Sequence, residues 1–188
     1  MPCPPTPVFG LTAAYPLGVI LALGRRSKMP AVKIMSILYI ELIRGVPLIS
    51  LLFMSSIIFP LFLPEGITIN KILRAQVAII LFTAAYIAEV VRGGLQGISR
   101  GQYEAAESLG LNYVLTMRLI ILPQALKIVI PPSVSILISA FKDTSLVVII
   151  ALFDILRTTQ TVLFNPEWMG FSREAYVFIG LLYFLGCF

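Results

Sequence analysis

Ionisable side chains that could do chemistry are rare in this chain, and four of them form two pairs within or at the end of long apolar runs. Glu41 and Arg44 lie at positions i and i+3, and Glu89 and Arg92 repeat that spacing. Residues so spaced share a helix face, so each pair could neutralise itself, with its arginine reaching toward the membrane interface. Alternatively, an ionisable group at membrane depth is costly to keep and marks a functional path. The spacing leaves both interpretations open.

A third polar group is a whole segment, residues 104–110, which separates two apolar runs. It is rich in good helix formers, and Gly110 predicts the end of a helix there. Ser99 could cap the start of that helix. Glu104 and Glu107 would share one face, and two adjacent alanines would let another surface approach closely. We expect a docking surface for a soluble partner, although a solvated helix that only connects two membrane spans fits the spacing equally well.

The composition excludes most catalytic chemistry. The 188 residues are 59% hydrophobic and 12% charged, about half the charge of an ordinary soluble domain. There is no histidine, and the nine acidic residues form no metal-like cluster. The two cysteines, Cys3 and Cys187, lie at opposite ends and match no redox or metal spacing. The net charge of +5 is scattered over loops, which favours a polytopic membrane protein without nucleic-acid binding.

Five apolar runs predict an all-α membrane protein, because roughly 20 apolar residues are needed to cross about 30 Å of hydrocarbon. The second run should break at Gly45-Val46-Pro47. Residues 143–172 contain an apolar stretch too short to cross, so we expect a re-entrant or interfacial element there; a surface loop with a short helix is the alternative. The five runs are residues 8–24, 35–63, 75–91, 117–141 and 175–188.

Basic residues orient these spans, because cytoplasmic loops carry an excess of lysine and arginine. Arg25, Arg26, Lys28 and Lys33 form a dense cluster after the first run. This bias places residues 99–123 in the cytoplasm and the N-terminus outside. We interpret residues 1–188 as one transmembrane domain that is truncated at both ends.

One motif resembles a known family. Glu104-Ala105-Ala106, Gly110 and Leu122-Pro123 have the spacing of the EAA loop found in permease subunits of binding-protein-dependent ABC importers. Residues 41–48, 85–95, 101–106 and 141–146 are similar to the polar amino-acid branch of that family, and most similar to its general L-amino-acid or glutamate/glutamine/aspartate type.

This resemblance implies a type I permease fold of about five helices in the bacterial inner membrane. The implied partners are ATPase subunits, a second permease subunit, an extracytoplasmic solute-binding protein and an amino-acid substrate. Residues 99–123 would be the cytoplasmic coupling region, with ATPase contacts through Glu104, Ala105, Ala106, Gly110, Leu122 and Pro123.

Energy would have to come from a partner, since the chain has no G-x-x-x-x-G-K-[ST] phosphate loop. We therefore expect no enzymatic activity, metal or cofactor in this chain, with ATP and Mg²⁺ used by the ATPase. Glu41, Arg44 and Glu89 would lie beside a path that handles the ammonium and carboxylate groups of an amino acid. An ATP-independent channel or ion-coupled carrier, and a scaffold without transport, are the alternatives.

Overall fold

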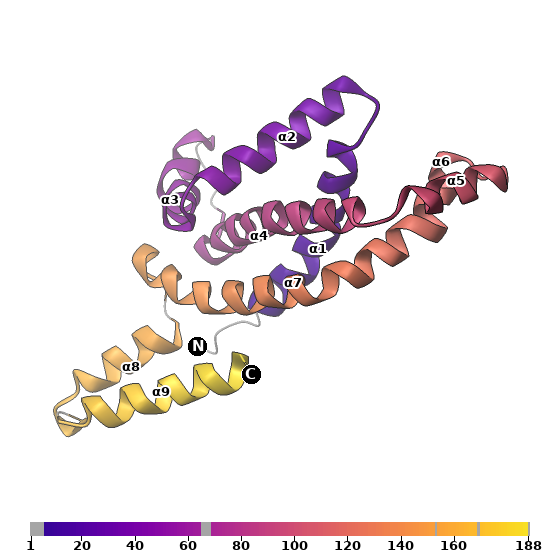
Figure 1. Ribbon diagram of the computed structural model, residues 1–188. Helices are drawn as coiled ribbons and strands as arrows, with labels where there is room; N and C mark the ends of the chain where they lie inside the picture. The colour runs from indigo at the N-terminus through magenta and orange to yellow at the C-terminus, as the bar shows by residue number, and fades with distance from the viewer. Residues whose placement is uncertain (1–5, 65–68, 153, 169, 188) are drawn as a thin grey trace. The chain divides into compact units, whose positions relative to one another are not determined.

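The computed structural model describes residues 6–64, 69–152, 154–168 and 170–187, and every regular element within them is helical (Figure 1). The predicted all-α class is therefore confirmed. Short 3₁₀ or π-helical segments follow several of the helices, at 54–58, 59–62, 117–121, 144–150 and 166–168. The α-helices are α1 (Thr6–Arg25), α2 (Pro30–Gly45), α3 (Leu48–Phe53), α4 (Lys71–Gln96), α5 (Arg100–Ser108), α6 (Tyr113–Thr116), α7 (Leu122–Asp143), α8 (Ile155–Leu163) and α9 (Ser172–Cys187).

Helices occupy all five apolar runs predicted to span the membrane. Two of the described helices are long and apolar enough to cross by themselves: Lys71–Gln96, and the continuous stretch Tyr113–Ile150 that contains α7. A third crossing results if the broken pair Pro30–Gly45 and Leu48–Phe62 counts as one span. α1 and α9 are outside this set; α9 has 16 residues, so it is about 24 Å long.

The predicted break in the second apolar run is confirmed. α2 ends at Gly45, and Val46 adopts an extended conformation with φ −104° and ψ 133°. Proline disfavours the helical conformation in the residue before it, which explains the extended Val46. Pro47 then stands at the N-cap of α3.

The chain forms two compact units. One is made of residues 11–46 and 80–137, and it contains both α5 and the four paired ionisable residues Glu41, Arg44, Glu89 and Arg92. Its core is built mainly from small and branched apolar side chains of α1, α2, α4 and α7. Gly94 shows how closely the helices approach, because a Cβ there would overlap the Val129 side chain and lie 3.0 Å from the Ala125 carbonyl oxygen. Small residues permit such packing where lipid supplies no hydrophobic driving force. The fully buried members are Ala14, Ala22, Ile40, Ala84, Ile87, Ala88, Val91, Leu95, Ile121, Ala125 and Val129.

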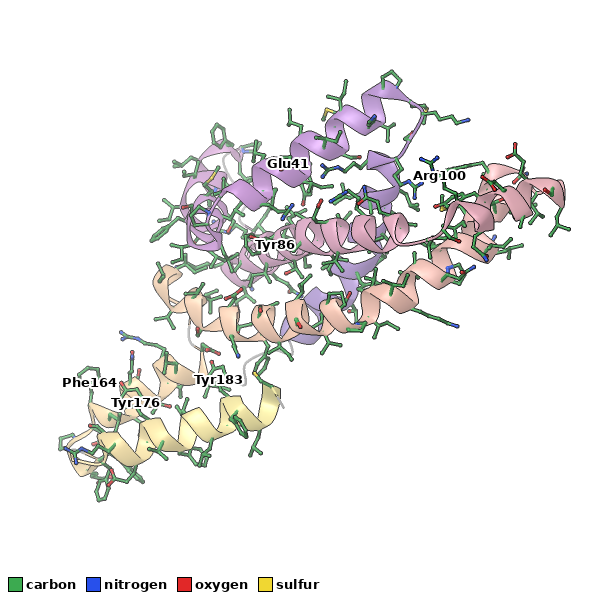
Figure 2. The ribbon with its side chains drawn as sticks, viewed as in Figure 1. Glu41, Tyr86, Arg100, Phe164, Tyr176 and Tyr183 are labelled. Atoms are coloured by element: carbon green, nitrogen blue, oxygen red, sulfur yellow. The ribbon has the colours of Figure 1, made fainter. Side chains whose placement is uncertain are left out.

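The other unit contains residues 1–10, 47–79 and 138–188. In it, α3 packs on the 3₁₀ segment Thr144–Ile150, and α8 packs on α9. Tyr183 of α9, labelled in Figure 2, donates a hydrogen bond to the buried Asp154 carboxylate over 2.8 Å. α8 is a short helix within residues 143–172. The expectation that this region is re-entrant stays a prediction.

Candidate functional site

The polar segment predicted as a helix forms α5, Arg100–Ser108. Ser99 precedes it in an extended conformation, with φ −63° and ψ 146°, as expected of a residue at the N-cap. The Ser99 side chain makes no capping hydrogen bond, however, so the position of the cap was predicted correctly and its usual contact is missing.

The C-terminal end of α5 is fixed by backbone hydrogen bonds around Gly110. The amide of Gly110 donates to the carbonyl of Glu107 over 2.9 Å, and the amide of Leu111 donates to that of Ala106 over 3.1 Å. These are the two bonds of a Schellman motif, which needs a left-handed residue at this position. Gly110 has φ +73°, and no atom lies within 4 Å of the place its Cβ would occupy. The positive φ is therefore the reason for glycine here, since there is room for a side chain.

α5 has one buried face and one free face. Ala106 is fully buried, and the helix packs on the π-helical turn Met117–Ile121. Glu104, Ala105 and Glu107 are exposed, and Leu109 just beyond the helix is 76% exposed. Of the two adjacent alanines, Ala106 thus anchors the helix and Ala105 remains on the free face.

Leu122 and Pro123, the far end of the motif, begin α7. Leu122 is partly buried against the core, and Pro123 is exposed. Leu122 donates its amide to the carbonyl of Met117, a bond one residue longer than in an α-helix. Proline cannot donate to the preceding turn and crowds its carbonyl, which gives a physical reason for the wider turn there.

Two polar contacts hold α5 against its own unit. The Arg26 guanidinium donates to the Tyr103 hydroxyl over 3.0 Å and lies 5.6 Å from the centre of that ring. Gln124 of α7 donates to the Gln102 side chain over 3.0 Å. No sequence pattern pairs Arg26 with Tyr103, because 77 positions separate them.

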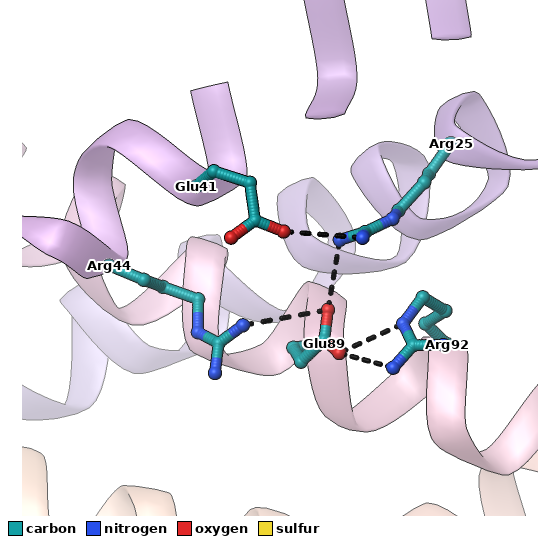
Figure 3. A network of polar contacts seen from close by, with 5 residues as sticks. All are labelled: Arg25, Glu41, Arg44, Glu89 and Arg92. Atoms are coloured by element: carbon teal, nitrogen blue, oxygen red, sulfur yellow. Dashed lines mark hydrogen bonds and ion pairs between the residues drawn. The ribbon is translucent and has the colours of Figure 1, made fainter. Parts of the chain in front are cut away.

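The second polar group is a network centred on Glu89 of α4 (Figure 3). One carboxylate oxygen of Glu89 lies 3.1 Å from Arg25 and 3.6 Å from Arg44. The other accepts from Arg92 Nε over 2.9 Å and from Arg92 Nη2 as well. Glu41 of α2 extends the network, since it lies 3.2 Å from Arg25. The network thus joins the C-terminal end of α1 to α2 and α4.

The structure corrects one of the two predicted local pairs. Glu89 and Arg92 do pair across one turn. Glu41, however, pairs with Arg25 of α1, and Arg44 pairs with Glu89, so the ion pairs among the described residues do not include one between Glu41 and Arg44. The Arg44 guanidinium also lies 5.5 Å from the ring centre of Tyr86, which is labelled on α4 in Figure 2. Glu41 and Arg44 therefore each pair with a residue of another helix and not with each other.

The network carries excess positive charge. Three guanidinium groups face two carboxylates, which leaves one positive charge in excess. Arg44 Nε is buried and has no hydrogen-bond partner in the structure. The three residues predicted to line a path, Glu41, Arg44 and Glu89, are thus brought together, and Arg25 is the member that the sequence did not reveal.

Within the described ranges, no group of three or more cysteine or acidic side chains is arranged to hold a metal ion.

Residues 14–188 match the family model described as binding-protein-dependent transport system inner membrane component. The chain belongs to this family. The structure also resembles the crystal structure of an amino acid ABC transporter with histidines, with a TM-score of 0.83 and 30% sequence identity over 97% of this chain and 82% of that one. The type I permease fold predicted from the motif is confirmed by these two findings.

Two curated relatives in this family extend the comparison. The inner membrane amino-acid ABC transporter permease protein YhdY of Escherichia coli (strain K12) is 58% identical over 95% of this chain and 49% of its own length. The glutamate/glutamine/aspartate/asparagine transport system permease protein BztC of Rhodobacter capsulatus is 52% identical over 95% of this chain and 42% of its own. The chain therefore spans about half the length of these relatives.

Proposed function

We propose that this permease chain forms part of the membrane channel of an ABC importer that moves polar L-amino acids into the cytoplasm. The observation that carries the proposal is α5: a short helix with a free face of Glu104, Ala105 and Glu107, ended by a Schellman motif at Gly110. In a family of binding-protein-dependent transport components, such a helix suits an ATPase docking site. The names of the relatives, which transport amino acids, support the substrate class.

The same proposal assigns the partners and the orientation. ATPase subunits would bind α5 and the start of α7, at Glu104, Ala105, Gly110, Leu122 and Pro123. Ala106 is fully buried, so it would support the helix from its inner face without touching the ATPase. A second permease subunit would complete the channel, and a solute-binding protein would deliver the amino acid from outside. Residues 99–123 would lie in the cytoplasm and the N-terminus outside the inner membrane. The chain would act as a single transmembrane domain without a cofactor of its own, while the ATPase uses ATP and Mg²⁺.

The proposal places Glu41, Arg44 and Glu89 beside the solute path. Both oxygens of Glu89 are occupied by arginines, so Glu89 serves this path by holding Arg44 and Arg25 in position. Arg44 makes the longest ion pair of the network, 3.6 Å to Glu89, and is its most exposed arginine, so it is the member best suited to meet a carboxylate.

Two substitutions in α5 test the docking role. Glu104→Lys reverses a charge on the free face, and Gly110→Asp disfavours the left-handed conformation that ends the helix. Each should lower ATP-dependent uptake in reconstituted vesicles at least about tenfold, the size of effect that coupling between two sites commonly has. Both variants should still insert into the membrane.

Glu167→Lys is the matched control, because it reverses an exposed charge outside α5 and should leave uptake unchanged. ATP-dependent uptake that survives both α5 substitutions would contradict the docking role. Uptake that persists without ATP and collapses with an ion gradient would instead show an ion-coupled carrier.

A further inference from the structure

Two consecutive arginines at the end of α1 contact different parts of the same unit. Arg25 is the last residue of α1 and binds Glu41 and Glu89 over 3.2 and 3.1 Å. Arg26 follows it and binds Tyr103 of α5. Arg26 Nη1 also reaches the carbonyl oxygen of Leu95, in the last turn of α4, over 3.4 Å. One short stretch of backbone therefore carries both the tie to α5 and the tie to the Glu89 network.

The contact between Arg26 and Tyr103 has a defined geometry. Arg26 both donates to the hydroxyl oxygen of Tyr103 and lies over its ring, at 3.0 and 5.6 Å. A guanidinium is planar and rigid, so two such contacts fix its orientation better than a lysine could. The Cα atoms of Arg25 and Arg26 are joined by one planar peptide unit, so a displacement of one backbone position is carried to the next.

We propose that Arg26 is the positioning residue that transmits movement of α5 to the ionic network. A pull on α5 draws Tyr103, Tyr103 draws Arg26, and Arg25 then shifts against Glu41 of α2 and Glu89 of α4. This inference rests on the proposed docking of an ATPase on α5, since the ATPase would supply the pull. It adds a residue outside the EAA motif to the coupling apparatus.

If Arg26 only stabilised the fold, its removal would lower the unfolding temperature or release α5 from its partner. The Arg26–Tyr103 hydrogen bond is exposed, and exposed polar contacts add little to folding stability. α5 retains its buried Ala106 and the Gln102–Gln124 contact when Arg26 is removed. The helix should therefore stay folded and able to bind its partner, with only the transmission impaired.

The experiment uses the whole complex of permease, ATPase and solute-binding protein reconstituted in lipid vesicles. Arg26→Ala removes both contacts to Tyr103. Tyr103→Phe removes the hydroxyl and keeps the ring, and Arg26→Lys keeps a cation and loses the planar group. Lys28→Ala is the matched control, because it removes a positive charge from the same loop at an exposed position. Each variant is assayed for ATPase co-purification, thermal unfolding and solute molecules imported per ATP hydrolysed.

With Arg26→Ala, the ATPase should co-purify as with the unsubstituted chain, while solute imported per ATP falls about tenfold, an ordinary size for coupling between sites. Tyr103→Phe and Arg26→Lys should give intermediate losses, and Lys28→Ala none. Unchanged import per ATP in Arg26→Ala would overturn the inference, and so would loss of ATPase binding or a large fall in unfolding temperature. Failure of the unsubstituted complex to bind an ATPase would instead refute the docking proposal itself.

Discussion

α5 and α8 are both helices of nine residues between longer apolar helices, yet they are held in different ways. α5 buries Ala106 completely and has polar contacts from Arg26 and from Gln124. α8 contains no buried residue. Its anchor lies just before it, where the buried Asp154 carboxylate accepts a hydrogen bond from Tyr183.

The left-handed backbone positions near the two helices differ as well. α5 ends at Gly110, a glycine in the left-handed region, with both Schellman hydrogen bonds made. The chain reaches α8 through Ala151, the only described non-glycine residue with positive φ, at 54°. Left-handed backbone costs an L-residue roughly 1–2 kcal/mol, and glycine avoids that cost. α5 thus has a favourable end and polar ties to two neighbouring segments, whereas the buried polar contact beside α8 is the one between Asp154 and Tyr183.

The largest effect should come from removing that contact at α8. Tyr183→Phe deletes the donor to Asp154 and keeps the ring that packs on Phe141, with centroids 5.7 Å apart. Loss of a partner for a buried carboxylate should lower the free energy of unfolding by about 1–3 kcal/mol. Tyr176→Phe on the same helix is the control, because Tyr176 is 46% exposed. Chemical unfolding of the purified chain measures both, and equal losses would contradict the assigned importance of Asp154.

Effects of intermediate size on the free energy of unfolding, opposite in sign to each other, should follow from Gly110→Ala and Ala151→Gly. Gly110→Ala should lower the free energy of unfolding by about 1 kcal/mol through backbone strain alone, since its Cβ would meet no atom within 4 Å. Ala151→Gly relieves the same strain but adds freedom to the unfolded chain, so a gain of about 0.5 kcal/mol is expected. Unfolding measurements on both variants decide the matter, and a change of the same sign in both would break the comparison.

The smallest effect should come from the exposed amide contact at α5. Gln124→Ala removes the donor to Gln102, and should cost about 0.5 kcal/mol, as expected for one neutral hydrogen bond near water. A double-mutant cycle with Gln102→Ala measures the coupling between the two side chains. A coupling well above 1 kcal/mol would contradict the small contribution expected of this exposed contact.

Local features were predictable from the sequence. The bounds of α5, the glycine at its end and the break before Pro47 all depend on residues within a few positions of one another. The Glu89–Arg92 pair was predictable for the same reason, because one helical turn brings the two together.

Partners far apart along the chain were not predictable. Arg25 and Glu89 are 64 positions apart, and Arg26 and Tyr103 are 77 apart. The spacing of Glu41 and Arg44 allowed a local pair, but a charge on a packed helix pairs with whichever opposite charge the neighbouring helices present.

Composition and short-range spacing were enough to predict the all-helical class, the apolar runs, the polar helix before Gly110 and the family motif. The packing of the helices was needed to see that Glu89 holds three arginines and that Ala106 faces inward and Ala105 outward. It also revealed that Arg26, just after α1, binds Tyr103 of α5. The physical reason is that burial and charge pairing depend on how helices pack, and that packing is set by contacts between residues distant in sequence.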